Sequence, residues 1–237
     1  MQPAEKPVEK TDRLLLLNAV LGPLVLLPLM AALLFIPAGD AGWAMGWAVL
    51  AVYLGGLLAT NLLVSLRNPG LARERLHIPP SAKKWDRTLT TLANLSIFLM
   101  LPAAGLNRRC GWPPEVDLAL QWSFLAVYLL GYTLFGWAML SNRFFSSQVR
   151  IQADRGHVVE SGGPYRFVRH PGYLGAVVTL LSIPLALGSV WAAVFGVISA
   201  GLYILRTALE DKTLLQELPG YREYARVVRY RLLPLIW

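Results

Sequence analysis

The sequence predicts an all-α, polytopic membrane protein that crosses the bilayer about six times. Of its 237 residues, 55% are hydrophobic and only 15% are charged, whereas a soluble domain has about 25% charged residues. The apolar residues form six long runs, and every acidic or basic residue lies outside those runs. Because charge inside hydrocarbon costs free energy, this separation is typical of membrane-spanning helices.

The six runs define the predicted spans, since about 20 apolar residues cross a bilayer as one helix. The spans are 14–37, 43–66, 88–106, 118–140, 172–187 and 191–205. The first exceeds the roughly 7–15 apolar residues of a secretory signal, so we expect it to be retained. Little more than Gly188-Ser189 separates the last two, which predicts a tight helical hairpin over 172–205. The glycines Gly55-Gly56 and the Gly42/Gly46 pair are expected to allow close helix contacts.

The basic residues give the predicted orientation. Four segments together carry 20 of the 22 Lys and Arg residues: 1–13, 67–87, 141–171 and 206–237. The alternate connections carry only Arg108 and Arg109. By the positive-inside rule, the basic face is cytoplasmic. We therefore expect a multi-pass protein of a bacterial-type inner membrane, with both termini and the active site in the cytoplasm.

The chain divides into two predicted regions. Residues 1–140 hold the first four spans, and 141–237 hold the helical hairpin, a cofactor-binding region and an amphipathic cytoplasmic tail. The net charge of +8 does not indicate nucleic acid, because anionic lipid head groups explain a basic face in so apolar a chain. Membrane lipids are therefore the expected partners.

Metal and disulfide chemistry are not expected. Cys110 is the single cysteine, which excludes an internal disulfide and an all-cysteine metal site. The chain has three histidines and neither an HExxH nor a CxxC motif, so the sequence predicts no metal centre.

The stretch Gly162–Gly175 places polar side chains directly before the fifth span. Pro171 suits the first position of a helix and disfavours helical geometry at His170, which is then expected to cap that helix. Free N–H groups at a helix N-terminus bind anions, and Arg166 and Arg169 would add positive charge. The same two arginines equally fit topology signals that face anionic lipid, with Pro171 only starting a helix.

A second polar stretch begins at Arg206, after the hairpin. Arg206 and Glu210 lie four residues apart on one helix face, which is typical of a surface ion pair. Tyr221 and Tyr224 follow, and they fit either an interface belt or an aromatic wall for a cationic ligand. Because the hairpin returns the chain to the same membrane face, we expect both stretches to be neighbours and to form one composite site.

These motifs resemble the signature of the isoprenylcysteine carboxyl methyltransferase family of membrane enzymes. The matching segments are Gly163-Pro164-Tyr165-Arg166-x-x-Arg169-His170-Pro171-x-Tyr173, Arg206-x-x-x-Glu210-Asp211, Gly220-Tyr221-x-x-Tyr224 and Arg229-Tyr230-Arg231-Leu232-Leu233-Pro234. They come in the family's order, with the hairpin between the first and the second. The resemblance covers 145–237, and Ser147–Val159 is similar to a bacterial branch of the family. Two positions depart from the pattern: Asp211 replaces a second glutamate, and Gly162 is an extra glycine.

The resemblance implies methyl transfer from S-adenosylmethionine to a hydrophobic or lipid-like acceptor, with a carboxylate acceptor favoured. The implied cofactor-binding residues are Tyr165, Arg169, His170, Pro171, Tyr173, Glu210, Asp211, Tyr221 and Tyr224. Arg206 and Glu210 are the implied catalytic residues, with Arg206 orienting the acceptor carboxylate. A thiol or amine acceptor would instead need a base, for which His170 or Glu210 is the candidate.

Three other functions fit the same residues. One is an S- or N-methyltransferase for small thiols or phospholipid amines. Another is an NADPH-dependent enzyme similar to the membrane sterol reductases, which have a somewhat similar basic, histidine-containing C-terminal region. The last is a non-enzymatic membrane protein whose basic face binds anionic lipid.

Overall fold

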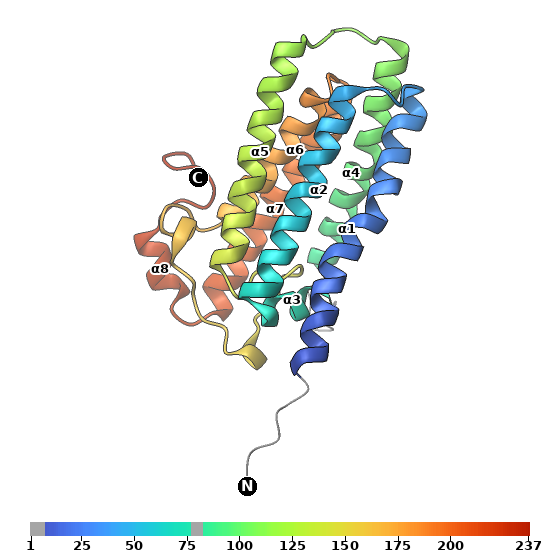
Figure 1. Ribbon diagram of the computed structural model, residues 1–237. Helices are drawn as coiled ribbons and strands as arrows, with labels where there is room; N and C mark the ends of the chain where they lie inside the picture. The colour runs from blue at the N-terminus through green and yellow to red at the C-terminus, as the bar shows by residue number, and fades with distance from the viewer. Residues whose placement is uncertain (1–7, 77–82) are drawn as a thin grey trace.

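The computed structural model describes residues 8–76 and 83–237. Its helices and 3-10 turns are α1 Val8–Ala38, α2 Ala44–Arg67, α3 Pro69–Arg75, α4 Lys84–Cys110, α5 Leu118–Ser141, η1 Ala153–Arg155, η2 Gly163–Arg166, α6 Pro171–Ala186, α7 Ala193–Glu217 and α8 Tyr221–Val227. Within these two ranges the chain forms helices and no β-strand, which confirms the predicted all-α class (Figure 1).

Each of the six predicted spans coincides with a helix. Five helices have the length and hydropathy to cross a membrane, namely α1, α2, α4, α5 and α7. The sixth, α6, is apolar but has 16 residues. It forms the predicted hairpin with α7 through a turn in which Gly188 has φ +71°, a backbone conformation that favours glycine. Both α4 and α7 extend beyond their apolar runs, so their polar ends leave the predicted spans.

Glycines allow the closest backbone contacts between helices. A Cβ atom on Gly175 of α6 would lie 2.6 Å from the carbonyl oxygen of Gly131 of α5. A Cβ atom on Gly105 of α4 would lie 2.4 Å from the carbonyl oxygen of Leu34 of α1. Because no side chain fits at such distances, these positions need glycine for the observed packing.

The two glycine pairs expected to allow close helix contacts, Gly42/Gly46 and Gly55-Gly56, differ in what they contact. Gly46 and Gly56 pack against aromatic rings, and a Cβ there would lie 2.9 Å from Phe35 and 2.6 Å from Tyr132 respectively. Among the described residues, no other helix lies within 4 Å of a Cβ placed on the remaining two, Gly42 and Gly55. The expected close contacts are therefore correct for one glycine of each pair.

The connections gather at two ends of the bundle (Figure 1). One end, here called the α8 end, carries the start of α1, α3, α8 and the loop 142–170. The opposite end, here called the turn end, carries the α1–α2, α4–α5 and α6–α7 connections. At the turn end Arg108 Nη2 lies 3.1 Å from Asp40 Oδ2, and Trp191 Nε1 donates to the carbonyl oxygen of Pro113 at 2.8 Å. The connections therefore alternate between the two ends in the predicted order.

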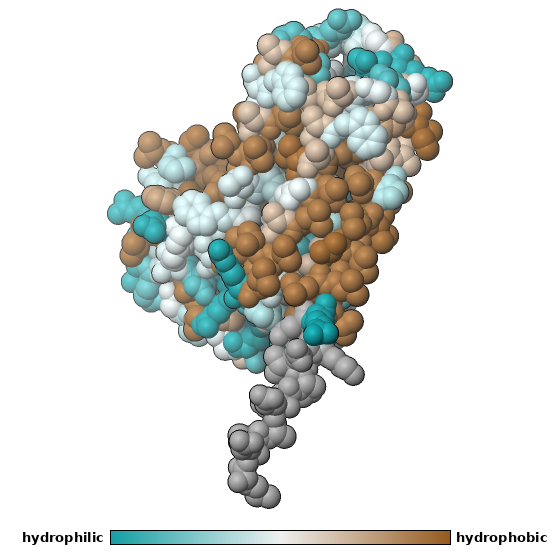
Figure 2. Space-filling model, in the orientation of Figure 1, coloured by the Kyte–Doolittle hydropathy of each residue, from teal (hydrophilic) through white to brown (hydrophobic). Residues whose placement is uncertain are grey.

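Apolar side chains cover the outside of the bundle between these two ends (Figure 2). Val25, Ile36 and Leu130 are 76%, 73% and 68% exposed. An apolar surface of this extent is typical of helices that contact lipid, since soluble proteins rarely leave so much apolar area uncovered. The chain is therefore an integral, multi-pass membrane protein.

Candidate functional site

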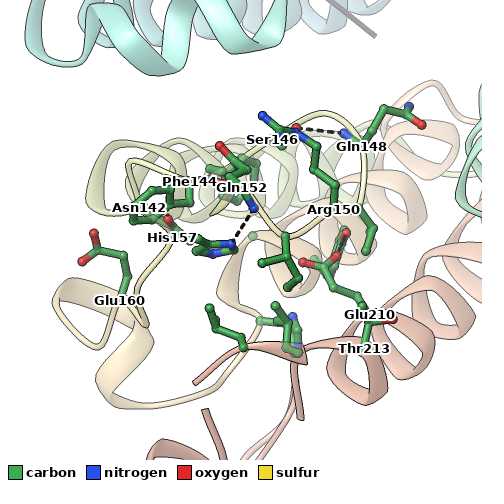
Figure 3. A pocket seen from close by; sticks show the side chains of 18 of the residues that line it. Asn142, Phe144, Ser146, Gln148, Arg150, Gln152, His157, Glu160, Glu210 and Thr213 are labelled. Carbon is green, nitrogen blue, oxygen red and sulfur yellow. Dashed lines mark hydrogen bonds between the residues drawn. The ribbon is translucent and has the colours of Figure 1, made fainter. Parts of the chain in front are cut away.

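A cavity of about 330 Å³ lies at the α8 end, and Figure 3 shows its surroundings. Glu210 and Thr213 of α7 lie on one side, opposite His157 and Gln152 of the loop 142–160. The start of α6 and the tyrosines of α8 complete the lining. The volume is within the range of small-molecule sites, which is about 300–1,000 Å³.

The first predicted motif folds as its sequence indicates. Pro171 is the first residue of α6, and His170 is the N-cap with φ −128°. The backbone N–H groups of Arg169 and His170 donate to the carbonyl oxygens of Tyr230 and Arg231, each at 2.9 Å. The C-terminal segment therefore lies along the motif and fixes its backbone. His170 and Arg169 are buried and line the cavity.

Asp211 joins the two predicted halves of the site. Its fully buried carboxylate accepts hydrogen bonds from Arg169 Nε and Arg231 Nε, each at 2.8 Å, and from Tyr221 Oη at 2.9 Å. His170 Nε2 lies 3.2 Å from the same carboxylate. Protein groups therefore surround Asp211, which lies behind the cavity wall and is not among the cavity-lining residues. Its geometry is that of a residue that positions Arg169, His170 and Tyr221.

Glu210 lies beside Asp211 in sequence but faces the cavity. Tyr173 Oη donates to its Oε2. In the described part of the chain no arginine, lysine or histidine forms an ion pair with Glu210. The carboxylate is therefore available to a cationic or hydrogen-bond-donating ligand.

The predicted surface ion pair between Arg206 and Glu210 is wrong. Arg206 is 8% exposed and donates from Nε and Nη2 to both oxygens of Asp86, at 2.6 and 3.2 Å. Its Nη2 also donates to the carbonyl oxygen of Ser147 at 3.0 Å, and its Cζ lies 5.3 Å from the Tyr173 ring centre. The difference arises because α4 begins before its apolar run and brings Asp86 against α7.

The predicted tyrosines are buried. Tyr224 Oη donates to the carbonyl oxygen of Tyr165 at 2.6 Å, and Tyr165 Oη accepts from Asn142 Nδ2 at 3.3 Å. Tyr221 and Tyr224 are 4% and 8% exposed and both line the cavity, so the interface-belt alternative is wrong. Burial raises the pKa of Tyr165, Tyr221 and Tyr224, which keeps their hydroxyls protonated.

Arg166 is separate from the site. It is exposed, does not line the cavity and donates from Nε to the carbonyl oxygen of Gly163 at 3.1 Å. Of the two arginines in the first motif, Arg166 therefore fits a membrane-surface residue and Arg169 a residue of the site.

The loop 142–160 supplies lining residues that the motifs do not indicate, including Asn142, Phe144, Gln148, Gln152 and His157. The backbone N–H of Gln152 donates to His157 Nδ1 at 3.2 Å, and Gln152 Nε2 donates to the carbonyl oxygen of Phe144 at 2.7 Å. The similarity of Ser147–Val159 to a bacterial branch of the family is the sequence signal that points to this loop. No such signal exists for Asp86 and Arg75, which reach the site from the first half of the chain.

Arg150 fixes the same loop to α3. Its guanidinium donates from Nε and Nη2 to the two oxygens of Glu74, each at 2.9 Å, and from Nη1 to Asp154 Oδ1 at 2.7 Å. Hydrogen bonds from Arg150 lower the pKa of Glu74, which keeps this carboxylate ionised.

Residues 124–216 match the model of the Isoprenylcysteine carboxyl methyltransferase (ICMT) family. The matched segment runs from α5 through α7 and includes the loop 142–160, the first motif and the Arg206–Asp211 motif. No curated protein matches the chain. Over residues 124–216 the family match confirms the resemblance that the motifs predict, and it supports an ICMT-like assignment of this segment.

Proposed function

We propose that the chain transfers a methyl group from S-adenosylmethionine to a hydrophobic acceptor in the cavity at the α8 end. The observation that carries this proposal is the cavity-facing carboxylate of Glu210, which has no cationic partner among the described residues. It lies within the segment that matches a methyltransferase family. When bound, S-adenosylmethionine would supply an electrophilic methyl group.

The polar groups of the cavity fit this cofactor. Gln148 Oε1 is buried and has no hydrogen-bond donor among the described residues. Gln148 and Glu210 therefore offer two acceptors to a ligand that carries an ammonium group, ribose hydroxyls and an adenine amino group. The aromatic rings of Tyr173 and Phe144 line the same space and suit a sulfonium cation.

Two residues that the resemblance assigns to cofactor binding, Arg169 and Asp211, have a different role in this proposal. Arg169 already donates to Asp211 and to the carbonyl oxygens of Val228 and Arg229. We therefore assign Arg169 and Asp211 to positioning His170 and Tyr221, whereas Glu210, His170 and Tyr173 contact the cofactor. Tyr165, Tyr221 and Tyr224 complete the wall, and Pro171 holds His170 at the end of α6.

The residues of the chain mainly orient and desolvate the reactants. A carboxylate acceptor is ionised at neutral pH, so transfer of the methyl group to its oxygen would need no general base from the chain. Positioning and exclusion of water then supply the catalytic effect. Arg206 stays the proposed orienting residue, with its Nη1 as the terminal nitrogen that does not bind Asp86 or Ser147.

Titration of the purified protein with S-adenosylmethionine and, separately, with NADPH tests the proposal. We expect binding of S-adenosylmethionine alone. Glu210→Gln and His170→Ala should each weaken it by more than about tenfold, since a hydrogen bond to a charged group contributes about 1.5–3 kcal/mol. Glu223→Gln is the matched control, because Glu223 is exposed and does not line the cavity. Stabilisation by NADPH alone, or unchanged affinity in both variants, would contradict the proposal.

We further propose that the α8 end faces the cytoplasm of a bacterial-type cell. This assignment rests on the basic segments that gather there, which the positive-inside rule places in the cytoplasm.

A further inference from the structure

Arginines are the main cations of the cavity wall. Four of them line it: Arg75, Arg150, Arg169 and Arg206. Three are bound by carboxylates, with shortest distances of 2.7 Å from Arg150 to Asp154, 2.8 Å from Arg169 to Asp211 and 2.6 Å from Arg206 to Asp86. Arg75 is the exception, because no carboxylate of the described residues forms an ion pair with it.

The short helix α3 places Arg75 at the cavity. Asn68 caps α3, and its side chain accepts a hydrogen bond from the backbone N–H of Leu71 at 3.2 Å. Leu71 is fully buried and packs with Val64 of α2 and Met139 of α5. Arg75 is the last residue of α3, so this anchoring fixes the position from which its side chain enters the cavity.

Within the described residues, the positive charge of the Arg75 guanidinium is compensated only by a carbonyl oxygen and an aromatic ring. Its Nη1 donates to the carbonyl oxygen of Phe145 at 3.2 Å, and its Cζ lies 5.8 Å from the centre of the Phe145 ring. The neighbouring carboxylate, Glu74, is bound by Arg150. Burial lowers the pKa of Arg75, and Arg206 lowers it further. Arg75 is half-buried. A charge that is partly withdrawn from water without a counter-ion costs free energy, so a ligand anion at this place would bind favourably.

Apolar and aromatic side chains surround the same part of the cavity. This part of the cavity is lined by Arg75 together with Phe135 of α5, Phe145 of the loop 142–160 and Tyr203 of α7. Thr90 and Asn94 of α4 extend the lining toward the membrane-spanning part of the bundle. A ligand that satisfies both features carries an anionic group on an apolar chain.

We propose that Arg75 binds the carboxylate of the methyl acceptor and selects amphipathic carboxylates over their neutral analogues. The inference rests on the proposed methyl transfer and assigns the residue that determines its acceptor preference. Arg75 lies outside the segment that matches the family, so the acceptor preference is a property of the first half of this chain. Arg75 then holds the acceptor carboxylate by its charge, and Arg206, which lies against Tyr173 near Glu210, orients that same carboxylate.

Binding measurements on the full chain in lipid nanodiscs test this role. The probes are two matched pairs, laurate with methyl laurate and N-acetyl-S-farnesylcysteine with its methyl ester. For the wild type we expect each carboxylate to bind at least about tenfold tighter than its ester, as expected for a hydrogen-bonded ion pair. In Arg75→Gln that ratio should fall to about one, while Arg75→Lys should keep part of it. Arg67→Gln is the control, because Arg67 is exposed and does not line the cavity.

Two results would overturn the inference. One is a wild type that does not prefer the carboxylate in either pair, and the other is an Arg75→Gln variant that keeps the preference. Titration with S-adenosylmethionine separates this proposal from the previous one. Lack of cofactor binding by the wild type would contradict the methyltransferase proposal, whereas a carboxylate preference could still be measured. Loss of cofactor binding in Arg75→Gln alone would show that Arg75 binds the cofactor's carboxylate and would refute its role toward the acceptor.

Discussion

Two buried carboxylates organise the charged residues at the site. Asp211 holds Arg169 and Arg231, while Asp86 holds Arg206 and accepts the backbone N–H of Val149 at 2.8 Å. Neither carboxylate is exposed to solvent. Removing one partner of a buried ion pair leaves an uncompensated charge, which costs more than the pair itself contributes. We therefore expect variants at these positions to change stability as well as activity.

The ion pair between Arg206 and Asp86 leads to a testable prediction about stability and turnover. Arg206→Met should lower the free energy of unfolding by about 3–5 kcal/mol, because Asp86 then stays buried without a cation. It should also abolish turnover, while S-adenosylmethionine affinity is largely kept in the folded fraction. Denaturant unfolding in detergent and a binding titration measure the two effects.

A double variant separates the ion pair from other consequences of the substitution. Asp86→Leu combined with Arg206→Met should regain part of the lost stability, because no unpaired charge remains. Arg67→Met, which replaces an exposed arginine, should leave stability nearly unchanged. Strictly additive losses in the double variant would show that the two side chains are not coupled.

Among the elements, the loop 142–160 depends on polar contacts more than on apolar packing. Arg150 binds it to Glu74 of α3, Arg206 binds the carbonyl oxygen of Ser147, and His157 accepts the N–H of Gln152. His157 also packs against the ring of Phe144, with ring centres 4.6 Å apart. A loop that is held by hydrogen bonds to a neutral histidine is sensitive to protonation of that histidine.

The pH dependence of this loop can be predicted from His157. Burial, followed by the charges of Arg150 and Arg155, lowers the pKa of His157 from 6.5 to about 4. The ordered loop keeps the imidazole neutral, whereas an opened loop binds a proton below pH 6.5. The loop should therefore keep its full stability above pH 6.5 and lose it progressively as the pH falls toward 4. Hydrogen exchange of residues 142–160 at pH 7 and pH 5, corrected for intrinsic rates, measures the change.

His157→Gln is the control for this effect, because the amide oxygen can still accept the N–H of Gln152 but does not titrate in this range. The difference in protection between pH 7 and pH 5 should become much smaller in this variant. An equal pH dependence in both proteins would assign the effect to other groups, such as Asp154.

At the scale of the whole molecule, the two ends of the bundle differ in charge. The described parts of the basic segments lie at the α8 end with the cavity, whereas the turn end carries Arg108 and Arg109. Arg108 is partly neutralised by Asp40. This asymmetry leads to the proposed orientation, with the α8 end in the cytoplasm.

Cys110 offers a direct measurement of orientation. It is the single cysteine of the chain, it is exposed, and it ends α4 at the turn end. A membrane-impermeant maleimide should therefore label Cys110 in intact cells. In a Cys110→Ser background, Ser161→Cys should be labelled only after permeabilisation, because exposed Ser161 belongs to the opposite end. The reverse labelling pattern would invert the proposed topology.

The sequence predicts the helices well because apolar length is a local property. The run 172–187 becomes α6, Pro171–Ala186, and the run 118–140 becomes α5, Leu118–Ser141. Proline at position 171 and the hairpin glycine at 188 have their expected roles for the same reason. By contrast, the dipeptide Gly55-Gly56 does not show which glycine meets another helix, since that depends on how the helices are rotated.

The sequence by itself determined the all-α class of the protein, the positions of its apolar helices and the two motifs that resemble the ICMT family. The tertiary structure alone decided the partners of the charged residues. Asp86 and Arg206 are 120 positions apart, and Arg169 and Asp211 are 42 apart. A buried charge binds whichever counter-ion the packed helices bring within reach, and a four-residue spacing such as Arg206 to Glu210 cannot show this. For the same reason only the packing of α3 reveals Arg75 as the cation of the cavity that has no carboxylate partner in the described structure.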